Sequence, residues 1–124
     1  MEITTSQLQG RVPVTVFHIR GTVDSSTYQD FMNALRAAIE GGAEFLLIDL
    51  AEVSYMSSAG IRSLNEISLI LRNKYPQENG AKSPRSNHLG LLNPTDRVFD
   101  SLKISGVDAF FETHTNLEKA IASF

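Results

Sequence analysis

The stretch "DLAEVSYMSSAGIRSLNEI", residues 49–67, decides how this chain is interpreted. It begins at the end of an apolar run, contains the adjacent serines Ser57 and Ser58 before Gly60, and continues with apolar residues at helical spacing. A strand followed by a helix that opens on two hydroxyl groups suits three kinds of site. These are the nucleophile of a hydrolase, a helix N-terminus that binds phosphate, and a serine that a kinase phosphorylates.

On both sides of this stretch, strand patterns alternate with helix patterns. We expect the first ten residues to pair with 12–20 as a hairpin, further strands at 44–50, 88–92 and 107–113, and helices that begin near residues 25, 58, 94 and 116. The run 44–50 is almost continuously apolar, as in a parallel strand that is covered on both faces. Alternating strands and helices predict right-handed crossovers and helices packed on a sheet, which is an α/β fold.

Composition indicates one small domain. The chain has 124 residues, of which 42% are hydrophobic and 20% charged, as in an ordinary soluble protein. Its net charge is −3 without a basic cluster, which argues against nucleic-acid binding. It has no cysteine, so disulfides and thiolate metal sites are excluded. Because no signal peptide or membrane-spanning run is visible, we expect a cytoplasmic protein without a membrane partner.

Polar residues are expected to meet at one edge of the sheet. Asp24 follows the strand 12–20, and Ser57 and Ser58 follow the apolar strand at 44–50. In α/β sheets, functional sites often lie where the carboxyl ends of neighbouring strands meet. Two interpretations remain open at this stage: a phosphate at the helix N-terminus, or Ser57 as a simple helix cap worth about 1 kcal/mol.

The sequence argues against a serine hydrolase. The residues around Ser58, "MSSAG", lack the first glycine of the G-x-S-x-G nucleophile elbow. His18, His88 and His114 lie in or beside predicted strands, and none has the paired spacing of a metal site. His18 is expected to be a core or edge histidine. We therefore predict no enzymatic activity, no metal and no cofactor.

The segment 73–87, "NKYPQENGAKSPRSN", fits neither pattern. Pro76, Gly80 and Pro84 interrupt regular structure, and the segment is long for a connection between a helix and a strand. We expect a single domain over residues 1–124 with a mobile loop at about 73–87. A partner-specific contact of this loop is the alternative interpretation.

The run "LLIDLAEVSYMSSAGIRSL", residues 46–64, closely resembles the central motif of STAS domains, which are named for sulphate transporters and anti-sigma factor antagonists. Two further stretches are similar to the family pattern and follow in family order. They are "IRGTVDSSTY" (19–28), in which Asp24 is the acidic residue, and "NPTDRVFDSLKISGVDAFF" (93–111). The resemblance implies a STAS-like (SpoIIAA-like) fold, a mixed sheet of about four to five strands with about four helices.

The resemblance also implies a function, that of a bacterial anti-sigma factor antagonist. In this family the unphosphorylated antagonist binds an anti-sigma factor that is also a serine kinase of the GHKL type, and the sigma factor is freed. The kinase then phosphorylates the serine two positions before the motif's glycine, here Ser58, and a PP2C-type phosphatase resets the switch. The implied partner-binding residues are Asp24, Met56, Ser57, Ser58, Ala59, Gly60 and Ile61. Met56, Ala59 and Ile61 are expected to form an apolar docking patch.

Two positions depart from the family motif. Its aspartate is Ser57 here, and its second serine is Ala59. The first change removes a negative charge beside Ser58 and makes Ser57 a rival phosphoacceptor. The alternative function is therefore a STAS scaffold that is never phosphorylated, in a lipid-transport or stress-sensing assembly. A weak homodimer is also left open.

Overall fold

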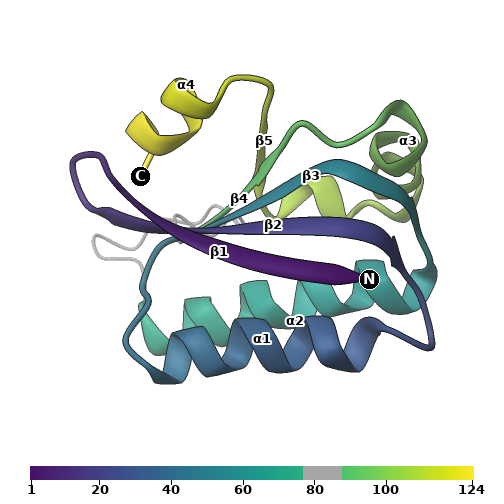
Figure 1. The fold of residues 1–124 in the computed structure, drawn as a ribbon, viewed down its shortest axis with the longest axis horizontal. Helices are drawn as coiled ribbons and strands as arrows, with labels where there is room; N and C mark the ends of the chain where they lie inside the picture. Colours follow the sequence, from purple (N-terminus) through teal and green to yellow (C-terminus); the bar gives the residue numbers. More distant parts are fainter. Residues whose placement is uncertain (77–87) are drawn as a thin grey trace.

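The computed structural model describes residues 1–76 and 88–124, and it forms a five-stranded mixed sheet with helices on both faces (Figure 1). In chain order the elements are β1 (Glu2–Gln9), β2 (Pro13–Val23), α1 (Tyr28–Glu40), β3 (Leu46–Met56), α2 (Ser58–Lys74), β4 (Leu89–Leu92), α3 (Asp96–Ser105), the 3₁₀ helix η2 (Val107–Ala109), β5 (Glu112–His114) and α4 (Leu117–Ala122). The strands lie side by side in sequence order. β1 pairs with β2 in antiparallel fashion, and all other pairs are parallel.

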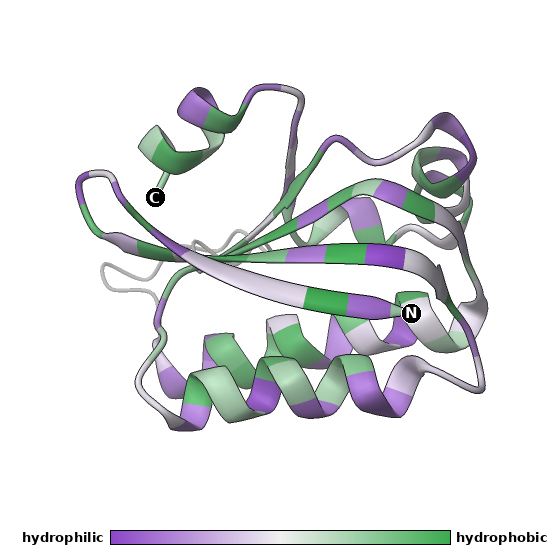
Figure 2. Ribbon diagram, viewed as in Figure 1, coloured by the Kyte–Doolittle hydropathy of each residue, from purple (hydrophilic) through white to green (hydrophobic). Residues whose placement is uncertain are grey.

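Helices α1 and α2 lie next to each other on one face of the sheet, and α3 and α4 lie toward opposite ends of the other face (Figure 1). Hydrophobic and hydrophilic residues alternate along α1 and α2, as in amphipathic helices (Figure 2). Apolar residues at helical spacing face the core and are buried: Phe31, Met32, Leu35 and Ile39 in α1, and Ile61, Leu64, Ile67 and Leu71 in α2. A smaller cluster, which includes Val14, Val16, Leu47 and Ile121, fills the space under α4. The predicted α/β fold and its hairpin edge are confirmed.

Several predicted boundaries were wrong, among them the end of β2, which lies at Val23 instead of residue 20. β3 continues to Met56 instead of ending at residue 50, because β2 supplies it with a parallel partner as far as Val23. Residues 107–113 do not form one strand; only Glu112–His114 pair, because β4 offers them just Gly90–Leu92 as partners. Helix α1 begins at Tyr28 with Thr27 as its N-cap residue, three residues after Asp24.

The expected loop at 73–87 begins later than predicted. Helix α2 continues through Lys74, and the Lys74 ammonium donates a hydrogen bond to the carbonyl oxygen of Ile39 in α1 at 3.0 Å. This contact fixes the end of α2 against α1. The remaining part of the expected loop, 77–87, lies outside the described residues.

Candidate functional site

The candidate site is the rim of the sheet where β2 and β3 end. Val23, the last residue of β2, pairs with Met56, the last residue of β3, and the Ser57 N–H donates to the Val23 carbonyl oxygen at 2.8 Å. Asp24 follows Val23 directly, and Ser58 opens α2. The structure therefore brings Asp24, Ser57 and Ser58 to one edge, as the sequence predicted.

Ser57 caps helix α2. Its backbone is extended (φ −76°, ψ 175°), its Oγ accepts a hydrogen bond from the Gly60 N–H at 3.4 Å, and its carbonyl accepts the first helical bond, from Ile61. Ser58 is the first residue of the helix and is exposed. The two neighbouring hydroxyl groups thus differ: one is engaged with the backbone, and the other faces solvent at the positive end of the helix dipole.

Gly60 lets the first turn of α2 approach β2 closely. A Cβ atom at this position would lie 2.7 Å from the Val23 carbonyl oxygen and 2.7 Å from Met56 Cγ. No side chain fits between these atoms, so the glycine of the motif sets how deeply α2 sits against the sheet. Gly60 is itself buried and offers no surface to a partner.

The prediction of an apolar docking patch was wrong. Met56 is 1% exposed and Ile61 is 9% exposed, and both belong to the main hydrophobic core. Ile61 begins the buried stripe of α2, and Met56 packs beneath the Gly60 turn. Only Ala59, which is half-buried, remains of the three residues.

An exposed aromatic residue at this end of β3 was missed by the sequence reasoning. Tyr55 is 39% exposed, and the Arg97 guanidinium lies over its ring, 4.9 Å from the centroid. Residues next to each other in a strand point to opposite faces, so a buried Met56 could have indicated an outward Tyr55. Tyr55 pairs with Thr22 of β2, which lies two residues before Asp24.

Asp24 supplies a negative charge at the rim. Its carboxylate accepts hydrogen bonds from the Ser26 hydroxyl at 2.6 Å and the Ser26 N–H at 2.9 Å, with a longer one from the Thr27 hydroxyl. The bonds from Ser26 lower the pKa of the Asp24 carboxyl below its ordinary value. The side chain is therefore held in its ionised form by its own turn.

Other kinds of site find no support in the part of the chain that the structure describes. No three side chains of His, Cys, Asp or Glu gather there in a way that could hold a metal ion. None of the helices described is both long and apolar enough to cross a membrane. A hollow of about 690 Å³ is lined by residues that include Pro13, Thr15 and Phe45, at the end of β2 and β3 away from the rim, and no predicted site residue lines it.

Comparison with known proteins places this architecture in a family. A sequence model of the STAS domain matches residues 5–75, which contain β2, β3 and the whole rim. The chain belongs to the STAS domain family. No curated protein sequence matches this STAS domain.

Solved structures share the STAS fold over almost the full chain. An anti-sigma factor antagonist from Mycobacterium paratuberculosis is 20% identical, with a TM-score of 0.71 over 98% of this chain and 93% of that one. The unphosphorylated form of the antagonist SpoIIAA is 19% identical, with a TM-score of 0.73 over 97% and 93% of the two chains. The phosphorylated form of the Bacillus cell fate determinant SpoIIAA is 16% identical, with a TM-score of 0.67 over 97% and 96%. At these identities the matches establish the shared fold.

Proposed function

We propose that this STAS domain is an anti-sigma factor antagonist that is switched by phosphorylation of Ser58. The fold is shared over nearly the whole length with proteins described as anti-sigma factor antagonists, one of them in a phosphorylated form. The observation that carries the choice of residue is the difference between the two serines. Ser57 Oγ accepts the Gly60 N–H as the helix cap, whereas Ser58 is exposed at the first helical position.

The rim has the physical properties that such a switch needs. A phosphate on Ser58 adds about −1.5 to −2 charges. The free N–H groups and the positive dipole end of α2 tolerate that charge within the domain. A partner that covers Ser58 would have to bury it, which costs several kcal/mol when the charge is unpaired. The ionised Asp24 on the same rim adds to the negative charge.

The proposed partner is an anti-sigma factor that is itself a serine kinase of the GHKL type, with a PP2C-type phosphatase to reset the switch. The proposed contact surface contains Asp24, Ser57, Ser58 and Ala59, to which the structure adds the exposed Tyr55. In this role the rim binds a partner and accepts a phosphate, and it catalyses no reaction. We place the exchange in the bacterial cytoplasm, where sigma factors act.

Binding of the cognate kinase to serine variants tests the proposal. Ser58→Ala should bind at least as well as the wild type and should stay bound when ATP is added. Ser58→Asp should bind more weakly, and the phosphorylated wild type weaker still, by roughly 100-fold or more, which is about 2.7 kcal/mol. Ser25→Ala is the matched control, because Ser25 is an exposed serine beside Asp24 on the same rim. It should behave as the wild type.

Phosphopeptide mapping separates the remaining possibilities. A label on Ser57 would move the switch by one position, against the capping geometry described above. The replacement of the motif's aspartate and second serine by Ser57 and Ala59 favours one alternative function, a STAS scaffold that is never phosphorylated. That alternative predicts no label on either serine and a complex that ATP leaves intact.

A further inference from the structure

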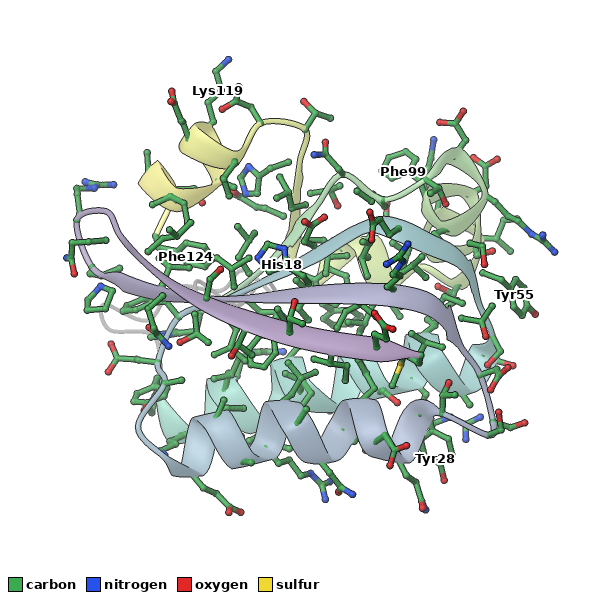
Figure 3. The ribbon with its side chains drawn as sticks, viewed as in Figure 1. His18, Tyr28, Tyr55, Phe99, Lys119 and Phe124 are labelled. Atoms are coloured by element: carbon green, nitrogen blue, oxygen red, sulfur yellow. The ribbon has the colours of Figure 1, made fainter. Side chains whose placement is uncertain are left out.

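A chain of polar side chains crosses three neighbouring strands away from the rim. His18 in β2 lies on the face that also carries Val14 and Val16, the face covered in part by α4. Figure 3 shows His18 on the side of the sheet where α3 and α4 lie. Its ring reaches Ser6 of β1 on one side and Asp49 of β3 on the other.

The distances within this chain are those of direct hydrogen bonds. Ser6 Oγ lies 3.0 Å from His18 Nε2, and His18 Nδ1 lies 3.0 Å from Asp49 Oδ2. The second carboxylate oxygen of Asp49 accepts the Ala51 N–H at 3.0 Å, which holds the carboxylate in position. Each ring nitrogen of His18 therefore has its own partner.

The partners fix where the protons are. An ionised Asp49 can only accept hydrogen bonds, so a neutral His18 carries its proton on Nδ1 and donates it to the carboxylate. His18 Nε2 is then a bare acceptor, and the Ser6 hydroxyl donates to it. A nucleophilic hydroxyl, a base and a carboxylate that orients the base stand in the order required for acyl transfer.

The three side chains are also within reach of solvent. The side chain of His18 is 43% exposed and that of Asp49 is 23% exposed, and Ser6 is half-buried in the edge strand. Ser6, His18 and Asp49, which we call the relay, therefore lie on an open strand surface. Such a surface admits small substrates without selecting strongly by shape.

In contrast to the prediction from the sequence that the chain has no enzymatic activity, we propose that Ser6 is an acyl-accepting nucleophile, with His18 as its base, and that it turns over small esters with good leaving groups. Ser6 Oγ bonds to the ester carbonyl carbon while its proton moves to His18 Nε2. The bond from that carbon to the leaving oxygen breaks, and the leaving oxygen takes the proton from Nε2. Water then attacks the acyl carbon with the same nitrogen as base, which frees the carboxylic acid and returns a proton to Ser6. Asp49 is a positioning residue that keeps the proton of His18 on Nδ1.

The chain contains its own matched control. Ser123 Oγ lies 3.4 Å from His114 Nε2, but Glu112 Oε2 approaches the same nitrogen at 3.5 Å. A carboxylate and a hydroxyl on one nitrogen cannot form a relay through the ring, because the carboxylate attracts the proton to the nitrogen that the hydroxyl needs as acceptor. Ser123 should therefore stay unreactive although it lies beside a histidine.

The test uses the full chain with p-nitrophenyl acetate. Mass spectrometry after rapid quenching should find an acetyl group on Ser6 and none on Ser123. Release of p-nitrophenol should fall by about tenfold or more in Ser6→Ala and in His18→Gln, and it should be unchanged in Ser123→Ala and His114→Gln. Ser6→Cys should restore acylation at this position, since it keeps a nucleophile beside His18. Thermal unfolding of each variant shows that it is folded.

A spectroscopic measurement isolates the role of Asp49. In Asp49→Asn the amide should stabilise the other tautomer of His18, which ¹⁵N chemical shifts of the ring detect, and acylation should fall together with that change. Acetyl groups found on lysines but not on Ser6 would overturn the proposal. The proposal would also be overturned if Ser6→Ala released p-nitrophenol at the rate of the wild type, because His18 would then react with the ester without Ser6. If the relay only ties β1 to the sheet, Ser6→Ala lowers stability while the wild type shows no acetyl-Ser6. The outcome is independent of Ser58 and hence of the proposed switch.

Discussion

Replacement of Gly60 by alanine tests how the rim is built. The new Cβ would meet the Val23 carbonyl oxygen and Met56 Cγ at 2.7 Å and Val23 Cγ1 at 2.9 Å. Comfortable contacts between heavy atoms lie near about 3.5–4.0 Å, so α2 must shift outward. The Val23 oxygen also accepts the hydrogen bond from Ser57, and a shift of the helix lengthens it.

The expected loss of stability in Gly60→Ala is about 2 kcal/mol. Overpacking costs typically about 1–3 kcal/mol, and the upper end applies because one of the closest atoms is backbone. The better helix propensity of alanine offsets up to about 1 kcal/mol. For a domain of this size, the melting temperature should fall by roughly 6–12 °C. Urea unfolding followed by circular dichroism gives the free energy, with an unchanged m-value as the sign that the unfolded state is the same.

Gly41→Ala is the control for this measurement. Gly41 ends α1 with a helical φ of −77°, and its Cβ would be 3.2 Å from the Ala37 carbonyl oxygen at the closest. Its effect should stay within about 1 kcal/mol. If Gly60→Ala proves as stable as the wild type, the close approach of α2 to β2 does not explain the glycine.

Three further predictions concern Asp24 and Ser57 at the rim and the buried Leu64 of α2. The pKa of Asp24 is lowered in the folded chain, so its contribution to stability is present above the ordinary carboxyl pKa and is lost as the pH falls. The melting temperature should therefore depend less on pH in Asp24→Asn than in the wild type between about pH 5 and 2. Ser57→Ala removes the helix cap, and urea unfolding should show a loss of about 0.5–1 kcal/mol, at the low end because the capping bond is long at 3.4 Å. Leu64→Ala empties a site that is 0% exposed, and the same assay should show a loss of about 2–5 kcal/mol. A near-neutral Leu64→Ala would contradict the packing of α2 described here.

The sequence was sufficient to predict the rim because the position of the rim depends only on consecutive strands and the helix that joins them. Strands that are joined by a crossover helix run parallel and end at the same edge, so Asp24 and Ser57 had to meet there. The prediction of an apolar docking patch was wrong for a reason that also lies within one helix. Ile61 starts the series that continues with Leu64 and Ile67, and one stripe of a helix cannot face both the core and a partner.

Other features depend on register and on distant neighbours, which one sequence does not reveal. Val107, Phe110 and Phe111 favour a strand by propensity, yet the short β4 pairs with only the last part of this segment, and Phe111 fills the core from outside the sheet. Ser6 and Asp49 are far apart in the sequence, and only the register of three strands brings both to His18. The relay was therefore invisible when His18 was interpreted alone.

The sheet's strand order, identical to the order in the sequence, has a consequence for synthesis. Each strand leaves the ribosome after the strand beside which it will lie, so it joins an edge that is already formed. When α2 has been made, the nascent chain holds three strands and the whole rim, but β3 is still the edge of the sheet. The unpaired side of β3 carries the apolar run Leu46–Ile48 until β4 arrives. A ribosome that pauses after α2 would thus expose a nascent chain in which Ser58 is already in place and the free edge of β3 can aggregate.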